Sequence, residues 1–114
     1  MKASMYGNGY ANLVRAMRER IPFTTGGALR GERWTRDTVS IWDLGILHST
    51  YANQFMIDHL AGIEFVVWSY STPIAWVKND GEVVIPNAKY SVTTSRHQGL
   101  CYLLRGVTAS YIEA

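Results

Sequence analysis

The sequence predicts an α+β domain in which a small antiparallel β-meander of three or four strands packs with two or three helices. Three observations predict this class. Residues 63–70, IEFVVWSY, are rich in β-branched and aromatic side chains, which favour strands. The run Lys78-Asn79-Asp80-Gly81 is typical of a tight hairpin turn. From Ser95 onward, a helix-start signature precedes apolar residues spaced by three and four.

Four stretches are predicted as strands, and they are residues 63–70, 74–77, 82–85 and 89–93. Pro73 and the turn residues Pro86-Asn87 separate them.

The first of these strands is apolar on both sides. Alternation places Phe65, Val67 and Ser69 on one face, and Val66, Trp68 and Tyr70 on the other. A sheet with two apolar faces needs cover on both, from helices or from a partner subunit. We therefore expect a homo-oligomer, most simply a homodimer.

Three helices are predicted. The first runs from Gly9 or Tyr10 to Ile21 and is ended by Pro22. The second covers residues 49–60, with Ser49 or Thr50 as N-cap and Gly62 as C-cap. The third begins at Thr94 or Ser95, where Ser95 and Gln98 fit a capping box. Its apolar face is formed by Leu100, Leu103, Leu104 and Val107, and Gly106 is its C-cap.

The remaining segments carry weaker signals. Residues 1–8 are expected to be flexible, and the glycine-rich residues 23–31 to form a loop or tight turn. Residues 34–42 can hold a short extended segment, and Gly45 marks a break. With 114 residues and no linker-like tract, we expect one domain over residues 1–114.

The composition of the chain indicates the cellular compartment in which we expect the protein. Cys101 is the single cysteine, so an intramolecular disulfide is excluded. No apolar run approaches the ~20 residues that span a bilayer, and the N-terminus lacks the apolar region of a secretory signal. We expect a cytoplasmic protein without membrane partners.

Charge is distributed unevenly along the chain. Residues 1–36 hold seven basic and two acidic groups, and residues 37–114 hold four basic and seven acidic groups. Six of those seven basic groups are arginines, which suit planar contact with phosphate or carboxylate. The simpler interpretation is a solvated face whose charges pair with the acidic half.

Catalytic patterns are weak. His97 and Cys101 are four residues apart on one predicted helix, which is the spacing of a nucleophile and its base or of two metal ligands. A free cysteine among leucines is more often a small buried hydrophobe. Paired Cys/His clusters and paired carboxylates are absent from the sequence. We therefore predict no enzyme, no metal and no cofactor, and a hydrolase is the weakest alternative.

One segment suggests an anion or phosphate site. Thr93, Thr94, Ser95, Arg96 and His97 lie where a predicted strand enters a helix, and unpaired N–H groups at such an end attract anions. Arg30 is included as a candidate partner from the arginine-rich third. Helix capping, with the hydroxyls used internally, explains the same residues.

Three blocks of sequence carry a family resemblance. They are residues 23–31, FTTGGALRG, residues 70–76, which contain TPIAW, and residues 89–98, which contain YSVTTSRHQ. In this order they resemble an uncharacterised family of small proteins of tailed phages that infect mycobacteria and related actinobacteria. The resemblance implies a phage origin and expression in the host cytoplasm. It implies no activity, and residues 34–61 are not covered by these blocks.

Two function hypotheses follow. The first is a non-enzymatic phage accessory protein that binds a host macromolecule and alters host physiology or defence. The second is a nucleic-acid- or nucleotide-binding protein that uses the arginine-rich N-terminal third and the Thr93–His97 helix start. Host protein and nucleic acid are thus both candidate partners.

Overall fold

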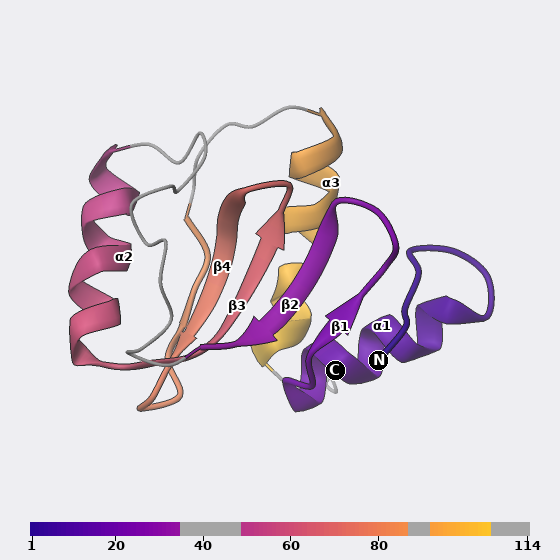
Figure 1. Cartoon of the computed structure of the whole chain (residues 1–114), viewed down its shortest axis with the longest axis horizontal. Helices are drawn as coiled ribbons and strands as arrows, with labels where there is room; N and C mark the ends of the chain where they lie inside the picture. The colour runs from indigo at the N-terminus through magenta and orange to yellow at the C-terminus, as the bar shows by residue number, and fades with distance from the viewer. Residues whose placement is uncertain (35–48, 87–91, 106–114) are drawn as a thin grey trace, which may run out of the picture.

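A computed structural model describes residues 1–34, 49–86 and 92–105. Its elements are α1 (Gly9–Glu19), β1 (Phe23–Thr24), β2 (Leu29–Arg33), α2 (Ser49–Ala61), β3 (Ile63–Ser69), β4 (Thr72–Lys78), β5 (Val83–Val84), α3 (Val92–Gly99) and a 3-10 helix, η1 (Cys101–Arg105). The strands form one antiparallel sheet in the order β1-β2-β3-β4-β5 (Figure 1). The predicted α+β class is confirmed.

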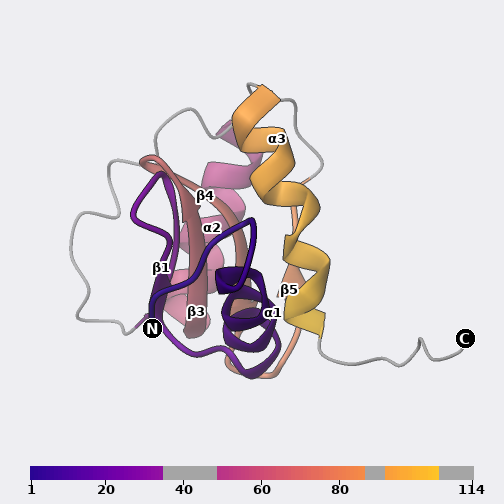
Figure 2. The same cartoon turned by 90° about the vertical axis from the view of Figure 1, so that its right-hand side faces the viewer.

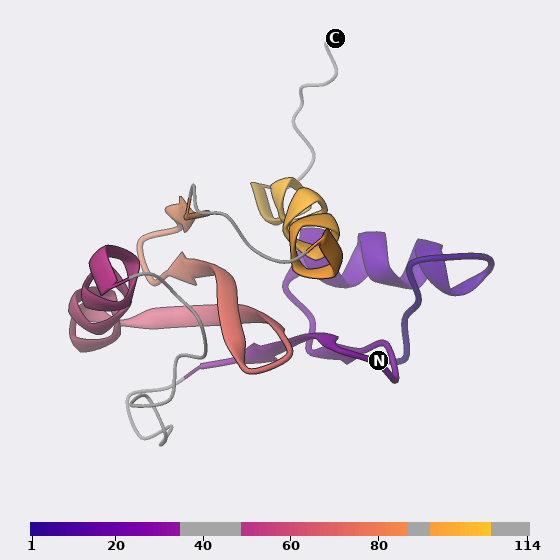
Figure 3. The same cartoon turned by 90° about the horizontal axis from the view of Figure 1, so that it is seen from above.

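Helices cover both faces of the sheet, as the two apolar faces of β3 require. On one face, α1 and the stretch from α3 to η1 lie together over the strands (Figures 2 and 3). Phe65 and Val67 of β3 belong to the core on that face. On the other face, Val66 and Trp68 pack with Phe55 of α2. The sheet therefore obtains its cover within one chain and does not itself require a partner subunit.

Two register shifts adjust which residues reach each core. One lies between Ile63 and Phe65, and the other between Val67 and Trp68. A bulge adds a residue to one strand and resets the alternation of faces. Ile63 accordingly joins the α2-side core, and consecutive residues Ile74 and Ala75 of β4 both join the opposite core.

The strand β4 is longer than the sequence pattern predicts. It begins at Thr72 and includes Pro73, which pairs with Trp68, whereas we predict a strand from residue 74. Proline is tolerated at the beginning of a strand and beside a bulge, and Pro73 meets both conditions. The hairpin turn at residues 78–81 is confirmed, with Gly81 at a φ of 94° and its N–H bonded to the Lys78 carbonyl.

The glycine-rich residues 23–31 form a β-hairpin, and their prediction as a loop is wrong at both ends. β1 pairs with β2, which continues the sheet by pairing with β3. Gly31 lies within β2, and a side chain there would collide with the rings of Phe23 and Phe65. Its glycine thus reflects close packing within a strand, and the same residue type misled the sequence interpretation.

The N-terminal residues, which we predict to be flexible, make defined contacts. Lys2 forms a bridge with Thr24, and the Ala3 N–H donates to the Thr24 carbonyl. Ala3 is buried in the core beside α1. These contacts extend the edge of the sheet by one short pairing.

The C-terminal helix differs from its prediction in two ways. α3 begins at Val92, so Val92 and Thr93 are helical and the predicted fourth strand at 89–93 is wrong at those two residues. Ser95 therefore lies inside the helix and is not its N-cap. The helix also ends at Gly99, and the apolar residues Leu103 and Leu104 reach the core from η1.

The first two helices agree closely with the sequence. α1 ends at Glu19, with Arg20 in the left-handed region before Pro22, and Gly62 caps α2 with its N–H on the Asp58 carbonyl. Some predictions fall outside the described residues. They concern residues 35–42, Gly45, residues 89–91, Gly106 and Val107. In the described part, no helix has the length and apolar character of a membrane span.

Candidate functional site

The residues predicted at the start of α3 divide between its two sides. Thr93, Ser95 and Arg96 are exposed, whereas Thr94 and His97 are buried. Positions three apart lie on one face of a helix, so Thr94 and His97 point together toward the sheet. The five residues thus do not form one exposed anion site.

Thr94 and His97 meet Ser69 of β3 in a buried polar cluster. The Ser69 hydroxyl bonds to Thr94 Oγ1 at 3.1 Å, and its oxygen lies 2.7 Å from His97 Nδ1. All three side chains are at least nine-tenths buried. Burial lowers the pKa of His97, because a charged imidazolium loses solvation there. Internal use of the hydroxyls is the alternative to an anion site that the sequence leaves open. For Thr94 this alternative is the one observed, because its hydroxyl bonds to Ser69.

Arg30 lies on the opposite face of the sheet from this cluster. It pairs with Trp68 across β2 and β3, and its guanidinium carbon lies 5.1 Å from the centre of the Trp68 ring. Its Nη1 donates to the Tyr70 carbonyl at 2.9 Å. Because Ser69 faces α3 and Trp68 faces away, the sheet separates Arg30 from His97. The two halves of the predicted anion site are not brought together.

Cys101 is fully buried and belongs to the core beside α1. Its thiol contacts the backbone carbonyl of His97 at 3.7 Å, and burial raises the pKa of the thiol well above its usual range. A reactive cysteine needs the thiolate form and some exposure. This arrangement favours the structural interpretation of Cys101.

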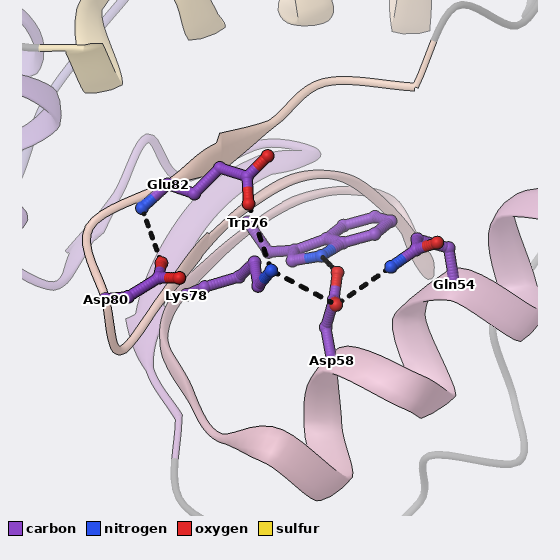
Figure 4. Close-up of polar contacts among 6 residues, drawn as sticks. All are labelled: Gln54, Asp58, Trp76, Lys78, Asp80 and Glu82. Atoms are coloured by element: carbon purple, nitrogen blue, oxygen red, sulfur yellow. Dashed lines mark hydrogen bonds and ion pairs between the residues drawn. The ribbon is translucent and has the colours of Figure 1, made fainter.

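A second buried polar cluster joins α2 to β4 (Figure 4). Asp58, 2% exposed, accepts hydrogen bonds from Trp76 Nε1 at 2.8 Å and from Gln54 Nε2 at 2.9 Å. The Lys78 ammonium lies 3.9 Å from the same carboxylate and 3.0 Å from Glu82. The bond to Glu82 and the attraction of Asp58 raise the pKa of Lys78 despite some desolvation. Asp58 thus fixes the position of α2 over the sheet.

His59, next to Asp58, holds a different tryptophan. Its Nδ1 accepts the indole N–H of Trp34 at 3.0 Å, and Trp34 packs edge-on against Phe55. The sequence pattern did not identify Asp58 and His59 as acceptors. A signal was available, since a buried tryptophan needs an acceptor for its N–H and the chain contains four. Which acceptor serves which indole depends on the tertiary structure.

Metal coordination finds no support in the described ranges, where no three His, Cys, Asp or Glu side chains converge. Open hollows lie at the surface of the described part of the chain. One, of about 210 Å³, is lined by Lys2, Ala3, Thr24, Thr25 and Gly26. Another, of about 180 Å³, is lined by Ala61, Gly62, Lys78, Asn79 and Asp80. Neither contains Ser69, His97 or Cys101.

The fold is that of a small α+β protein, and within the described residues the two buried polar clusters join helices to the sheet. A family model matches residues 45–107, more than half of the chain. The chain belongs to this family of unknown function, DUF8033. Comparison with curated proteins and with solved structures gives no match.

Proposed function

We propose that the chain is a non-enzymatic binding protein of phage origin that acts on a host macromolecule in the host cytoplasm. The observation that supports the non-enzymatic part is the burial of His97 and Cys101, the pair considered for catalysis, and of the neighbouring Ser69. Ser69, His97 and Cys101 are each at most 5% exposed. The Ser69 hydroxyl contacts His97 Nδ1, and the Cys101 thiol contacts the His97 backbone carbonyl. Catalysis needs such groups to reach a substrate.

The phage origin and the host target rest on the resemblance of the blocks at 23–31, 70–76 and 89–98. The family of unknown function adds neither an origin nor an activity. A protein that works by binding needs an exposed surface and no reactive group. The described surface offers Arg30 on the sheet and an exposed apolar pair on α2.

That apolar pair supports a homodimer as part of the proposal. Ile57 and Leu60 are each 60% exposed, lie three residues apart on α2 and therefore share a helix face. Their exposed neighbours Asn53 and Ala61 carry no charge. Two copies can therefore meet there without like-charge repulsion. A sedimentation measurement of Leu60→Glu against the parent chain tests this, with a dimer expected only for the parent.

The function is tested by capture from an actinobacterial lysate. The immobilised chain is expected to retain a host macromolecule in defined stoichiometry, identified by mass analysis of proteins, nucleic acids and small ligands. Cys101→Ala is the matched variant, and it should retain the same molecule because Cys101 is internal. Turnover of a captured small molecule that is lost in Cys101→Ala would contradict the non-enzymatic assignment.

A further inference from the structure

A row of side chains crosses the first three strands on the face away from α1. Lys2 pairs with Thr24, Thr24 pairs with Arg30, and Arg30 pairs with Trp68. Residues paired across strands project from the same face of the sheet. The neighbours of this row, Ala3 and Leu29, belong to the core on the other face. The row therefore consists of the Thr24 hydroxyl between the cations of Lys2 and Arg30, followed by the indole of Trp68.

Arg30 is held in place but its hydrogen-bonding capacity is mostly unused. A guanidinium has five N–H donors. Within the described part of the chain, the Tyr70 carbonyl is the single acceptor found for them, and no carboxylate there forms an ion pair with Arg30. The guanidinium lies over the Trp68 ring, which fixes its plane. A pre-positioned, unpaired arginine is suited to binding an anion.

The other end of the row opens into a hollow. The hollow of about 210 Å³ is lined by Lys2 and Thr24 together with the β1–β2 turn. The Thr24 hydroxyl accepts the Gly26 N–H at 3.1 Å, and among the described residues no acceptor is found for its own proton. A hydroxyl and an exposed ammonium thus border this hollow, and both can donate to a phosphate oxygen. Arg30 does not line the hollow, but it pairs with Thr24 on the adjacent strand.

Two further unusual features occur at the end of the row that contains Trp68. The indole N–H of Trp68 is buried and has no hydrogen-bond acceptor in the described ranges, which is rare in folded proteins. Tyr70, whose carbonyl holds Arg30, has a φ of 56°, which is unusual for a non-glycine residue. Tyr70 as a whole is 59% exposed. Tyr70 is thus an exposed aromatic residue whose backbone carbonyl holds the arginine.

We infer that this row, named here the Lys2–Trp68 row, binds single-stranded nucleic acid, with Lys2, Thr24 and Arg30 on phosphates and the Tyr70 ring available for base stacking. Single-strand binders combine a cationic track with aromatic side chains. An acidic peptide would use the cations but not the exposed ring. Glu32, two residues from Arg30 on β2, opposes the anion and limits affinity. The inference rests on the proposed binding function and names its ligand.

The test is a fluorescence-anisotropy titration of labelled oligothymidylate of about 16 nucleotides, an upper site size for small single-strand binders. The folded state of each variant is checked by its urea midpoint. Arg30→Ala should weaken binding about ten-fold, as expected for loss of a charged hydrogen bond. It should also reduce the slope of log affinity against log salt by about 0.7, the value for one phosphate contact on a single strand.

Arg33→Ala is the matched control. Arg33 is an exposed arginine of the same strand, and alternation places it on the opposite face with Leu29 and Gly31. It should leave affinity nearly unchanged. Arg30→Lys keeps the charge without the planar group and should bind between the parent and Arg30→Ala. Glu32→Gln should strengthen binding by removing a like charge from the ligand's path.

Three results overturn the inference. They are no binding at low salt, an equal loss for Arg30→Ala and Arg33→Ala, or equal competition by polyglutamate, which would mean a general polyanion surface. If the oligonucleotide does not bind but the lysate capture retains a host protein, the proposed function stands and this inference alone fails. If nothing is retained and no oligonucleotide binds, both fail.

Discussion

Trp76 on β4 donates its indole N–H to the carboxylate of Asp58 on α2 across 2.8 Å. Both side chains are almost completely buried. The bond crosses the layer between helix and sheet, and Gln54 and Lys78 approach the same carboxylate (Figure 4). A buried carboxylate is costly unless donors surround it, so this arrangement is favourable only when α2 occupies one position.

Removing that carboxylate should destabilise the protein strongly. Asp58→Ala is expected to lower the free energy of unfolding by about 3 kcal/mol, because it leaves buried donors without an acceptor. Urea denaturation followed by tryptophan fluorescence measures the change. Glu82→Gln is the control, because it removes the exposed partner of the same Lys78 and exposed pairs contribute little. Equal effects of the two substitutions would show that Asp58 has no special role.

Stability should depend on the protonation of His97. Its pKa is lowered in the folded state by burial, from an ordinary value of 6.5. Between the lowered pKa and 6.5 the unfolded chain binds more protons, so stability falls as pH decreases through this range and is fully present above it. Urea midpoints measured from neutral to mildly acidic pH should therefore decrease.

His97→Asn should flatten that dependence. Asparagine can still bond to Ser69 but does not titrate, so the variant isolates the protonation effect from the loss of the contact. The slope of midpoint against pH, rather than stability at a single pH, is the quantity to compare. An unchanged slope would assign the acid sensitivity to other groups.

The thiol of Cys101 should be inert in the folded protein. Burial removes access and raises its pKa, so little thiolate forms at neutral pH. Labelling by an aromatic disulfide reagent should be slow in buffer and rapid in denaturing urea. Fast labelling under native conditions would revive the hydrolase alternative with His97.

Two glycines should respond in opposite ways to alanine. Gly31→Ala places a methyl group against the rings of Phe23 and Phe65 and should cost about 1–3 kcal/mol of stability, the usual effect of overpacking. Gly99→Ala meets no atom within 4 Å and should leave stability equal or slightly higher. Urea midpoints of the two variants test this pair. Tolerance of Gly31→Ala would mean that the β1–β2 hairpin packs less tightly than described.

Much of the fold is predictable where local signals coincide. The boundaries of α2 agree because an N-cap, an apolar stripe and Gly62 all indicate the same helix. The hairpin at 78–81 agrees because Gly81 adopts the positive φ that the turn needs. The β1–β2 hairpin was missed because glycine and threonine favour turns locally. There, glycine is required by two rings, that of Phe23 on the paired strand β1 and that of Phe65 on β3.

The candidate site shows the same division. Helical spacing alone indicates that Thr94 and His97 share a face of α3. The partner of that face, Ser69, lies 25 residues from Thr94 and 28 from His97 and could not be inferred. Arg30 was grouped with these residues by charge, and the sheet places it on the other side.

The sequence by itself determined the α+β class, both apolar faces of β3 and the burial expected of Cys101, because these depend on periodicity and side-chain type. The tertiary structure alone decided that α1, α2, α3 and η1 cover those faces within one chain. It also decided which acceptor holds each paired indole, and that Lys2, Thr24, Arg30 and Trp68 form one row. These relationships depend on strand register and helix placement, which join residues distant in the chain.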